Sequence, residues 1–133
     1  MLRASRGFTL VELVVVMAVA AILAAVAIPT YRDQIRKGRR AEAREALMQV
    51  QAAQERWRSN NVTYAATVAA LGRPTVSASG NYAIAMSAAT ATGYTATATA
   101  QSKQAGDTDC AAITVVVANN VTTYGPSNAC WAR

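Results

Sequence analysis

Histidine is absent from this chain of 133 residues, and cysteine occurs only twice, at Cys110 and Cys130. Two cysteines alone cannot complete a tetrahedral zinc site. Asp107 and Asp109 offer two carboxylates, but calcium takes about six to eight oxygen ligands, so we interpret both as turn residues. No nucleophile stands beside a general base. We therefore expect no enzymatic activity, no catalytic residue, no cofactor and no metal.

Charge is nearly missing from one long stretch. The 21 residues from Phe8 to Ile28 carry a single charge, Glu12, and contain no glycine. As a helix this stretch is about 30 Å long, which is enough to cross the hydrocarbon core of a bilayer. Pro29 ends it and lacks a backbone N–H, which predicts a kink or local break within residues 26–29.

A signal-peptide cleavage site is also missing after the apolar run, where Pro29 is followed by Thr30 and Tyr31 instead of small residues. A short basic leader precedes the run and ends at Gly7, which is the better candidate for cleavage because glycine fits an extended backbone into a tight cleft. An ionised Glu12 so close to the bilayer is costly. It either reaches the lipid headgroups or has a functional partner.

The segment Gly7 to Leu13, GFTLVEL, followed by the apolar run to Pro29, resembles the N-terminus of type IV prepilins of the type IVa class. The resemblance implies cleavage between Gly7 and Phe8 by a prepilin peptidase, followed by N-methylation of Phe8. It also implies that Glu12 pairs with the freed amine of a neighbouring subunit during assembly. Pseudopilins of type II secretion share this motif.

The helix is expected to resume at Tyr31 and to continue to about Arg58, before the turn residues 59–61. An apolar stripe at three- and four-residue spacing should pack on a sheet. It consists of Ala43, Ala46, Leu47, Val50, Ala53 and Trp57. The basic run 36–40 is interpreted as a solvated face that pairs locally with Glu42 and with Arg44 and Glu45.

Four strands are predicted after a loop that contains a short helical turn near residues 65–71. They are 82–87, 94–100, 113–117 and 121–124, and the last two are joined by a tight turn at Asn119 and Asn120. In the second strand threonine and alanine alternate strictly, which places them on opposite faces. The fold class is α+β, with a long N-terminal helix packed on a small antiparallel sheet of three to four strands.

The C-terminal part resembles the minor pilins of the PilE/ComP group. The resemblance rests on the loop from Gln101 to Cys110 with Gly106 and Asp107, the closing Cys130 and Trp131, and the segments 55–57, 60–64 and 71–72. It implies an exported head with a Cys110–Cys130 disulfide. Pseudopilins usually lack this terminal cysteine loop. Many major pilins carry a glycine inside the apolar helix, whereas residues 8–28 of this chain contain none. If the helix unwinds in a filament, only Pro29 would favour the unwinding.

The predicted organisation is a leader (1–7), a transmembrane and assembly half-helix (8–30), an amphipathic half-helix (31–59) and a head with a disulfide loop (60–133). Removal of the leader takes away two arginines, so the net charge falls from +6 to +4. Lysines and arginines flank both ends of the span, and counted literally they would leave the head in the cytoplasm. The cysteine pair and the resemblance instead place the head in the periplasm before assembly and on an extracellular pilus afterwards.

The expected function is a structural subunit, specifically a minor pilin, that supports adhesion, twitching motility or DNA uptake. Its partners would be other pilin subunits in an open helical filament, the prepilin peptidase, the assembly machinery of the inner membrane and, before assembly, membrane lipid. One alternative is a DNA-uptake receptor that binds DNA through Arg73, Lys103 and Arg133. Another is a type II secretion pseudopilin. Eight of the eleven basic residues after the leader lie between Arg32 and Arg58, which favours the structural function.

Overall fold

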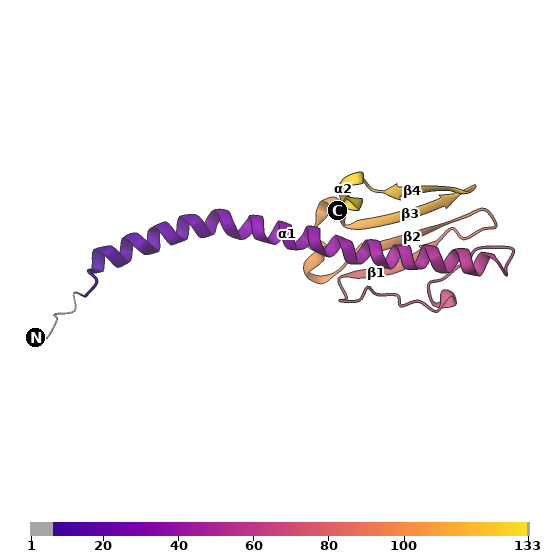
Figure 1. Ribbon diagram of the computed structural model, residues 1–133, viewed down its shortest axis with the longest axis horizontal. Coiled ribbons are helices and arrows are strands. Elements are labelled where there is room, and N and C mark those ends of the chain that lie inside the picture. Colours follow the sequence, from indigo (N-terminus) through magenta and orange to yellow (C-terminus); the bar gives the residue numbers. More distant parts are fainter. Residues whose placement is uncertain (1–6, 133) are drawn as a thin grey trace, which may run out of the picture. The chain divides into compact units, whose positions relative to one another are not determined.

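The computed structural model describes residues 7–132 and divides into two compact units, one that ends at Gln34 and one that begins at Ile35. Helix α1, Leu10–Arg58, contributes residues to both units, and the remaining elements belong to the second (Figure 1). Arg133 and the leader residues before Gly7 lie outside the described residues.

The first unit consists of the apolar part of α1 and the three residues before it. Every described residue up to Gln34 is exposed except Ala24, which is half-buried. By length and composition α1 qualifies as a membrane-spanning helix. It continues through Pro29 without the local break that the sequence predicted. The Thr30 hydroxyl donates a hydrogen bond to the carbonyl of Val26 (3.1 Å), beside the position where proline has no N–H. The kink itself stays a prediction.

The second unit contains a four-stranded antiparallel meander in the order β1-β2-β3-β4. The strands are β1 Tyr82–Ser87, β2 Gly93–Ala100, β3 Ala112–Ala118 and β4 Val121–Gly125, so all four predicted strands are confirmed. Asn119 and Asn120 both have positive φ, at 49° and 64°, as the predicted tight turn between β3 and β4 requires.

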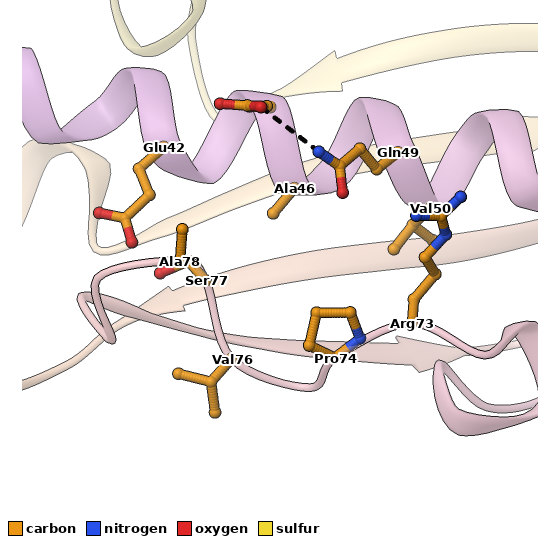
Figure 2. A pocket seen from close by; sticks show the side chains of 10 residues that line it. Glu42, Ala46, Gln49, Val50, Arg73, Pro74, Val76, Ser77 and Ala78 are labelled. Carbon is orange, nitrogen blue, oxygen red and sulfur yellow. Dashed lines mark hydrogen bonds between the residues drawn. The ribbon is translucent and has the colours of Figure 1, made fainter.

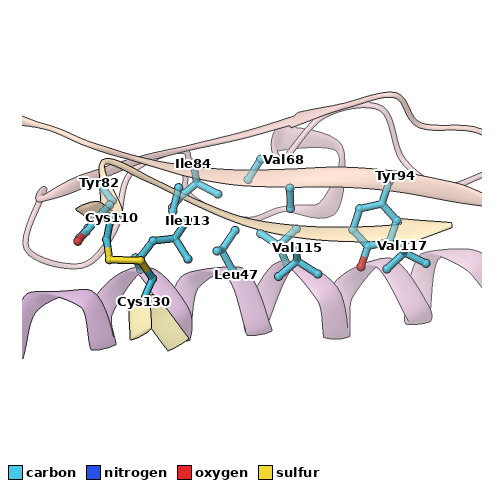
Figure 3. Packing of buried hydrophobic residues seen from close by; sticks show 14 of the residues in the cluster. Leu47, Val68, Tyr82, Ile84, Tyr94, Cys110, Ile113, Val115, Val117 and Cys130 are labelled. Atoms are coloured by element: carbon cyan, nitrogen blue, oxygen red, sulfur yellow. A yellow bond between two sulfur atoms is a disulfide. The ribbon is translucent and has the colours of Figure 1, made fainter. Parts of the chain in front are cut away.

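The part of α1 that belongs to the second unit lies along one face of this sheet (Figures 1 and 3). Its predicted apolar stripe is the surface that packs there, since Ala43, Leu47, Val50 and Ala53 are buried. The strict alternation in β2 also holds, with Ala96 and Ala98 buried and the threonines more exposed. The sheet contributes further core residues: Tyr82, Ile84, Tyr94, Ile113, Val115 and Val117.

The connections between these elements are compact. In the loop after α1 only Ala69–Leu71 forms a 3-10 turn, η1, which is shorter than the turn predicted near residues 65–71. Two further 3-10 turns, η2 Ser102–Gly106 and η3 Thr108–Cys110, join β2 to β3. The short helix α2, Asn128–Trp131, closes the chain beside the sheet.

Candidate functional site

The predicted processing site is exposed and lies outside regular structure. Gly7 and Phe8 precede the first helical residue, Leu10, and the Phe8 side chain is 85% exposed. A protease needs an accessible backbone at its cleavage site. Cleavage after Gly7 and methylation of Phe8 remain predictions.

Glu12 has a local role that sequence reasoning missed. The Thr9 N–H and the Thr9 hydroxyl both donate to the Glu12 carboxylate (3.2 Å each), and the Glu12 N–H donates to the Thr9 hydroxyl (3.3 Å). This reciprocal pair is a capping box, in which a threonine and an acid three residues later satisfy N–H groups at a helix start. The T-x-x-E spacing could have revealed it. The cap also holds the carboxylate beside the peptide group that follows Phe8.

The basic run 36–40 is not a uniformly solvated face, which corrects the sequence interpretation. Arg40 is 9% exposed and forms a two-point ion pair with Asp107, with Nε–Oδ2 and Nη2–Oδ1 distances of 2.7 Å each. Asp107 is 5% exposed and is therefore an ion-pair partner of α1, where the sequence indicated a turn residue. A buried arginine needs a partner of opposite charge, and the predicted local partners do not supply it.

Gln104 extends this buried pair into a network between α1 and the β2–β3 connection. Its side-chain nitrogen lies within hydrogen-bond distance of Asp107 Oδ2 (3.0 Å), the Tyr82 hydroxyl (2.9 Å) and the carbonyl of Arg36 (3.1 Å), and these three acceptors share its two N–H groups. The network attaches η2 to α1 near residue 36. Lys103, which is exposed on η2, therefore lies at that end of the second unit.

The C-terminal loop is closed as predicted. Cys110 and Cys130 form a disulfide, and both are fully buried. Trp131 packs on Tyr124 with ring centroids 4.6 Å apart, and its indole N–H donates to the carbonyl of Gly125 (2.9 Å). Arg44 donates to the carbonyls of Trp131 and Ala132, so it too binds a distant segment and not the acids near it in sequence.

The basic residues proposed for DNA binding do not converge. Arg73 lies beside Gln49 and Val50, whereas Lys103 lies near residue 36. Thirteen helical residues separate these points, a distance of roughly 20 Å along α1. Arg133 lies outside the described residues. The three positions thus do not form one patch within the described part of the chain.

A groove between α1 and the loop before β1 is lined by ten residues and has a volume of about 110 Å³ (Figure 2). Glu42 and Glu45 line it from α1, and Arg73 lines it from the loop, with its side chain reaching toward Val50 of α1. We call it the glutamate groove. Burial by itself would raise the pKa of Glu42, but hydrogen bonds from Asn81 and from the serines at 77 and 79 outweigh burial and lower it. Two carboxylates against one arginine make this groove unsuitable for an anion.

A second hollow, about 350 Å³ in volume, lies at the end of α1. We call it the arginine hollow, because Arg56 and Arg73 contribute the charges of its wall. Its lining residues are Ala53, Arg56, Trp57, Asn60, Asn61, Ala70, Leu71 and Arg73. None of the eight is acidic. Of these residues the sequence analysis proposed only Arg73 for DNA binding; the basic–aromatic pair of Arg56 and Trp57 was a signal for the others.

Among the described residues no group of three histidine, cysteine or acidic side chains is arranged to hold a metal ion. Asp107 is engaged by Arg40 and Gln104, so its carboxylate serves the buried network.

Comparison with known protein families gives two matches. Residues 29–114 match the model described as type IV minor pilin ComP, DNA uptake sequence receptor. Residues 2–28 match the prokaryotic N-terminal methylation motif. Together they cover residues 2–114, which include parts of both units.

Curated relatives include a fimbrial protein of Moraxella nonliquefaciens, 48% identical over 42 residues, which is 32% of this chain and 27% of that protein. A type IV major alpha-pilin of Moraxella bovis is 53% identical over 36 residues, or 27% of this chain and 23% of that pilin. Fimbrial protein EcpC of Eikenella corrodens is 47% identical over 38 residues, or 29% of this chain and 25% of that protein. The matched stretch spans about a quarter of the length of these relatives.

Proposed function

Because this chain belongs to the family of type IV minor pilins of the ComP type, we propose that it is a minor subunit of a bacterial type IV pilus. The subunit polymerises through the apolar half of α1 and presents the unit from Ile35 onward as its head. This is a structural function. The chain is itself the substrate of a processing reaction, which another protein carries out.

The main support for this proposal is the exposure of apolar side chains in the first unit. Large apolar side chains are exposed along its whole helix; for example Leu10 is 79% exposed, Ile22 68% and Val26 69%. Burial of such surface contributes about 25 cal/mol per Å², so the helix needs lipid or other helices around it. Before assembly, inner-membrane lipid supplies this environment. In the filament, the helices of neighbouring pilin subunits replace the lipid.

The N-terminal motif adds the processing step. A prepilin peptidase cleaves between Gly7 and Phe8, and the Phe8 amine is then methylated, in agreement with the matched methylation motif. The head lies in the periplasm until the assembly machinery of the inner membrane extracts the subunit into the pilus. The curated relatives named as fimbrial proteins or pilins favour a pilus over a type II secretion pseudopilus.

Mass spectrometry of sheared, purified filaments tests this function. We expect this subunit in the filaments in a small ratio to a more abundant pilin, with a mature N-terminus at methylated Phe8. Filaments that lack the subunit, or that contain it with the leader attached, would contradict the proposal.

DNA binding by the head is a second candidate function. It is favoured by one observation, the match of residues 29–114 to a family described as receptors of a DNA uptake sequence. The charges of the head agree with it only in part, because Arg40 and Arg44 are occupied within the head. Titration of the processed full chain in detergent with duplex DNA at physiological salt tests this function. We expect binding at micromolar affinity or tighter, and undetectable binding would exclude it.

A further inference from the structure

Positive charge gathers at the end of the head where α1 enters it. We call this surface the basic collar; it consists of Lys37 and Arg39 on α1 and Lys103 on η2. We propose that the basic collar binds the phosphate groups of anionic lipids at the periplasmic surface of the inner membrane. The inference rests on the membrane-bound stage of the proposed function, and it gives the head itself a partner of defined chemistry.

The cations of the collar are not used inside the head. Arg40, the buried member of the basic run, is neutralised by Asp107. Lys37 and Lys103 are exposed and Arg39 is half-buried, and none of the three has a hydrogen-bond or ion-pair partner within the described part of the chain. A cation that the fold leaves without a partner is available to an anion from outside.

The fold adds Lys103 to the cations of α1, although it is far from them in sequence. The Gln104 side chain lies 3.1 Å from the carbonyl of Arg36 and so attaches η2 to α1 at this end of the head (Figure 1). A Cβ on Gly106 would stand 2.7 Å from Arg36 Nη2, so the Arg36 guanidinium lies directly against this glycine. Lys103 therefore stays close to the α1 residues of the collar.

Positive charge exceeds negative charge at this end of the head. The segments that form it are 35–40 and 101–110, and their acids are Asp107 and Asp109. Since Asp107 is paired with Arg40, Asp109 alone faces the three cations of the collar. Each lysine or arginine close to an anionic leaflet strengthens binding by roughly fivefold. The balance of charge thus suits an anionic lipid surface.

The length of chain between the apolar run and the collar brings the collar to the bilayer surface. Lys37 and Arg39 follow Ile28 by roughly 14 and 17 Å of α1, at about 1.5 Å per residue, and tilt of the helix shortens both distances. The headgroup layer takes up ~5–8 Å of this length. The field of the headgroups extends about 8 Å farther at physiological salt, and long basic side chains reach back toward the membrane.

The arrangement of the α1 cations fits a lipid surface better than one compact anion. Lys37 and Arg39 are two positions apart, so they project to different sides of α1, about 200° apart around the helix axis. Gly38 stands between them, and nothing lies within 4 Å of the place where its Cβ would be. Lipids surround a single membrane helix, so headgroups meet both cations, whereas a compact anion would meet one.

The proposal also accounts for the cations that follow the membrane span. Counted literally, they would keep the head in the cytoplasm, but a long translocated segment crosses the membrane largely regardless of its charge. Anionic headgroups then supply partners for these cations on the periplasmic side. The collar is therefore compatible with an exported head.

The test uses the processed full chain in bilayer vesicles of phosphatidylcholine and phosphatidylglycerol. Spin-labelled forms of the two lipids report by electron spin resonance how strongly the protein retains each of them. We expect the anionic lipid to be preferred by about threefold or more at physiological salt. The preference should disappear at ~1 M salt, where the Debye length is about 3 Å.

Variants of the collar sharpen the test. Lys37→Gln with Arg39→Gln should reduce the preference for phosphatidylglycerol by about half or more. Lys103→Gln alone should reduce it by about a quarter or more, although nothing near it in sequence places it close to the membrane. The matched control, Arg56→Gln with Arg73→Gln, removes two charges from the arginine hollow and should change the preference by less than about a tenth. Urea unfolding followed by tryptophan fluorescence verifies that each variant is folded.

The outcomes separate the inference from the function on which it rests. An unchanged preference in either collar variant, or an equal loss in the arginine control, would overturn the inference. Inorganic phosphate that abolishes the preference, where chloride at the same ionic strength does not, would assign the collar to free phosphate and also overturn it. These results leave the pilus function standing, since filament composition decides that function. A chain that retains neither lipid would contradict the membrane-bound stage and the inference together.

Discussion

In the unit that ends at Gln34, apolar side chains such as Leu10 and Ile22 are exposed, whereas in the unit that begins at Ile35 the charged side chains of Arg40 and Asp107 are buried. One helix, α1, contributes to both units. Its first part has no partners for its apolar surface within the described unit. Its second part finds partners for both apolar and charged side chains within the head.

The difference shows where each unit obtains its stability. The head satisfies its buried charge internally, by the two-point pair of Arg40 with Asp107, and the Cys110–Cys130 disulfide cross-links it. The first unit depends on an environment outside itself, which is lipid or other subunits in the proposed function. Changes in the first unit should therefore act on assembly, and changes in the head on folding.

The largest expected effect concerns assembly. Glu12→Ala should reduce incorporation into filaments by about tenfold or more, because the freed amine of a neighbouring subunit loses its charged partner. Thr9→Ala is the matched control, since it removes the same capping box and leaves the carboxylate in place. Quantitative mass spectrometry of sheared filaments measures both variants. Equal losses would assign the role of Glu12 to capping alone.

The next effect concerns the folding of the head. Arg40→Ala or Asp107→Ala should each lower the free energy of unfolding by about 3–5 kcal/mol, since each leaves the other charge buried without its partner. Lys37→Ala, an exposed cation on the same helix, should change it by less than about 0.5 kcal/mol. Urea unfolding of the full chain in detergent, followed by tryptophan fluorescence, gives these values. Arg40 variants as stable as the Lys37 control would contradict the role of the ion pair.

The disulfide should have a similar or slightly smaller effect. Cys110 and Cys130 are 20 residues apart, and closing a loop of that size contributes about 3 kcal/mol in the chain-entropy model. Replacing both cysteines by serine should lower the free energy of unfolding by about this amount and leave membrane insertion unchanged. The same unfolding measurement with and without reductant checks it. A reductant effect that persists in the serine variant would point to another cause.

The smallest effect is a dependence on pH. In the folded state, hydrogen bonds outweigh burial and lower the pKa of Glu42 below the ordinary glutamate value of 4.5. Its contribution to stability is therefore present above the unfolded pKa and is lost as the pH falls through the folded value. Glu42→Gln should make the unfolding free energy less sensitive to pH below about 4.5. An unchanged pH profile in this variant would show that other carboxylates account for the acid sensitivity.

Local patterns in the sequence already determined much of this protein. The apolar run after Gly7, the stripe around Leu47, the four strands and the turn at Asn119 and Asn120 all follow from periodicity or turn chemistry over a few residues. These features depend on neighbours along the chain, so a single sequence reveals them. The N-terminal motif predicted the family in the same way.

The tertiary structure alone decided which charges are buried and which residues share a hollow. Arg40 and Asp107 lie 67 positions apart, and no local rule distinguishes Arg40 from Lys37 in the same basic run. Arg73 meets Arg56 and Trp57 only because the loop after α1 returns to the end of that helix. The reason is physical: a charge is buried only where the folded chain brings its partner, and periodicity carries no information about contacts between distant segments.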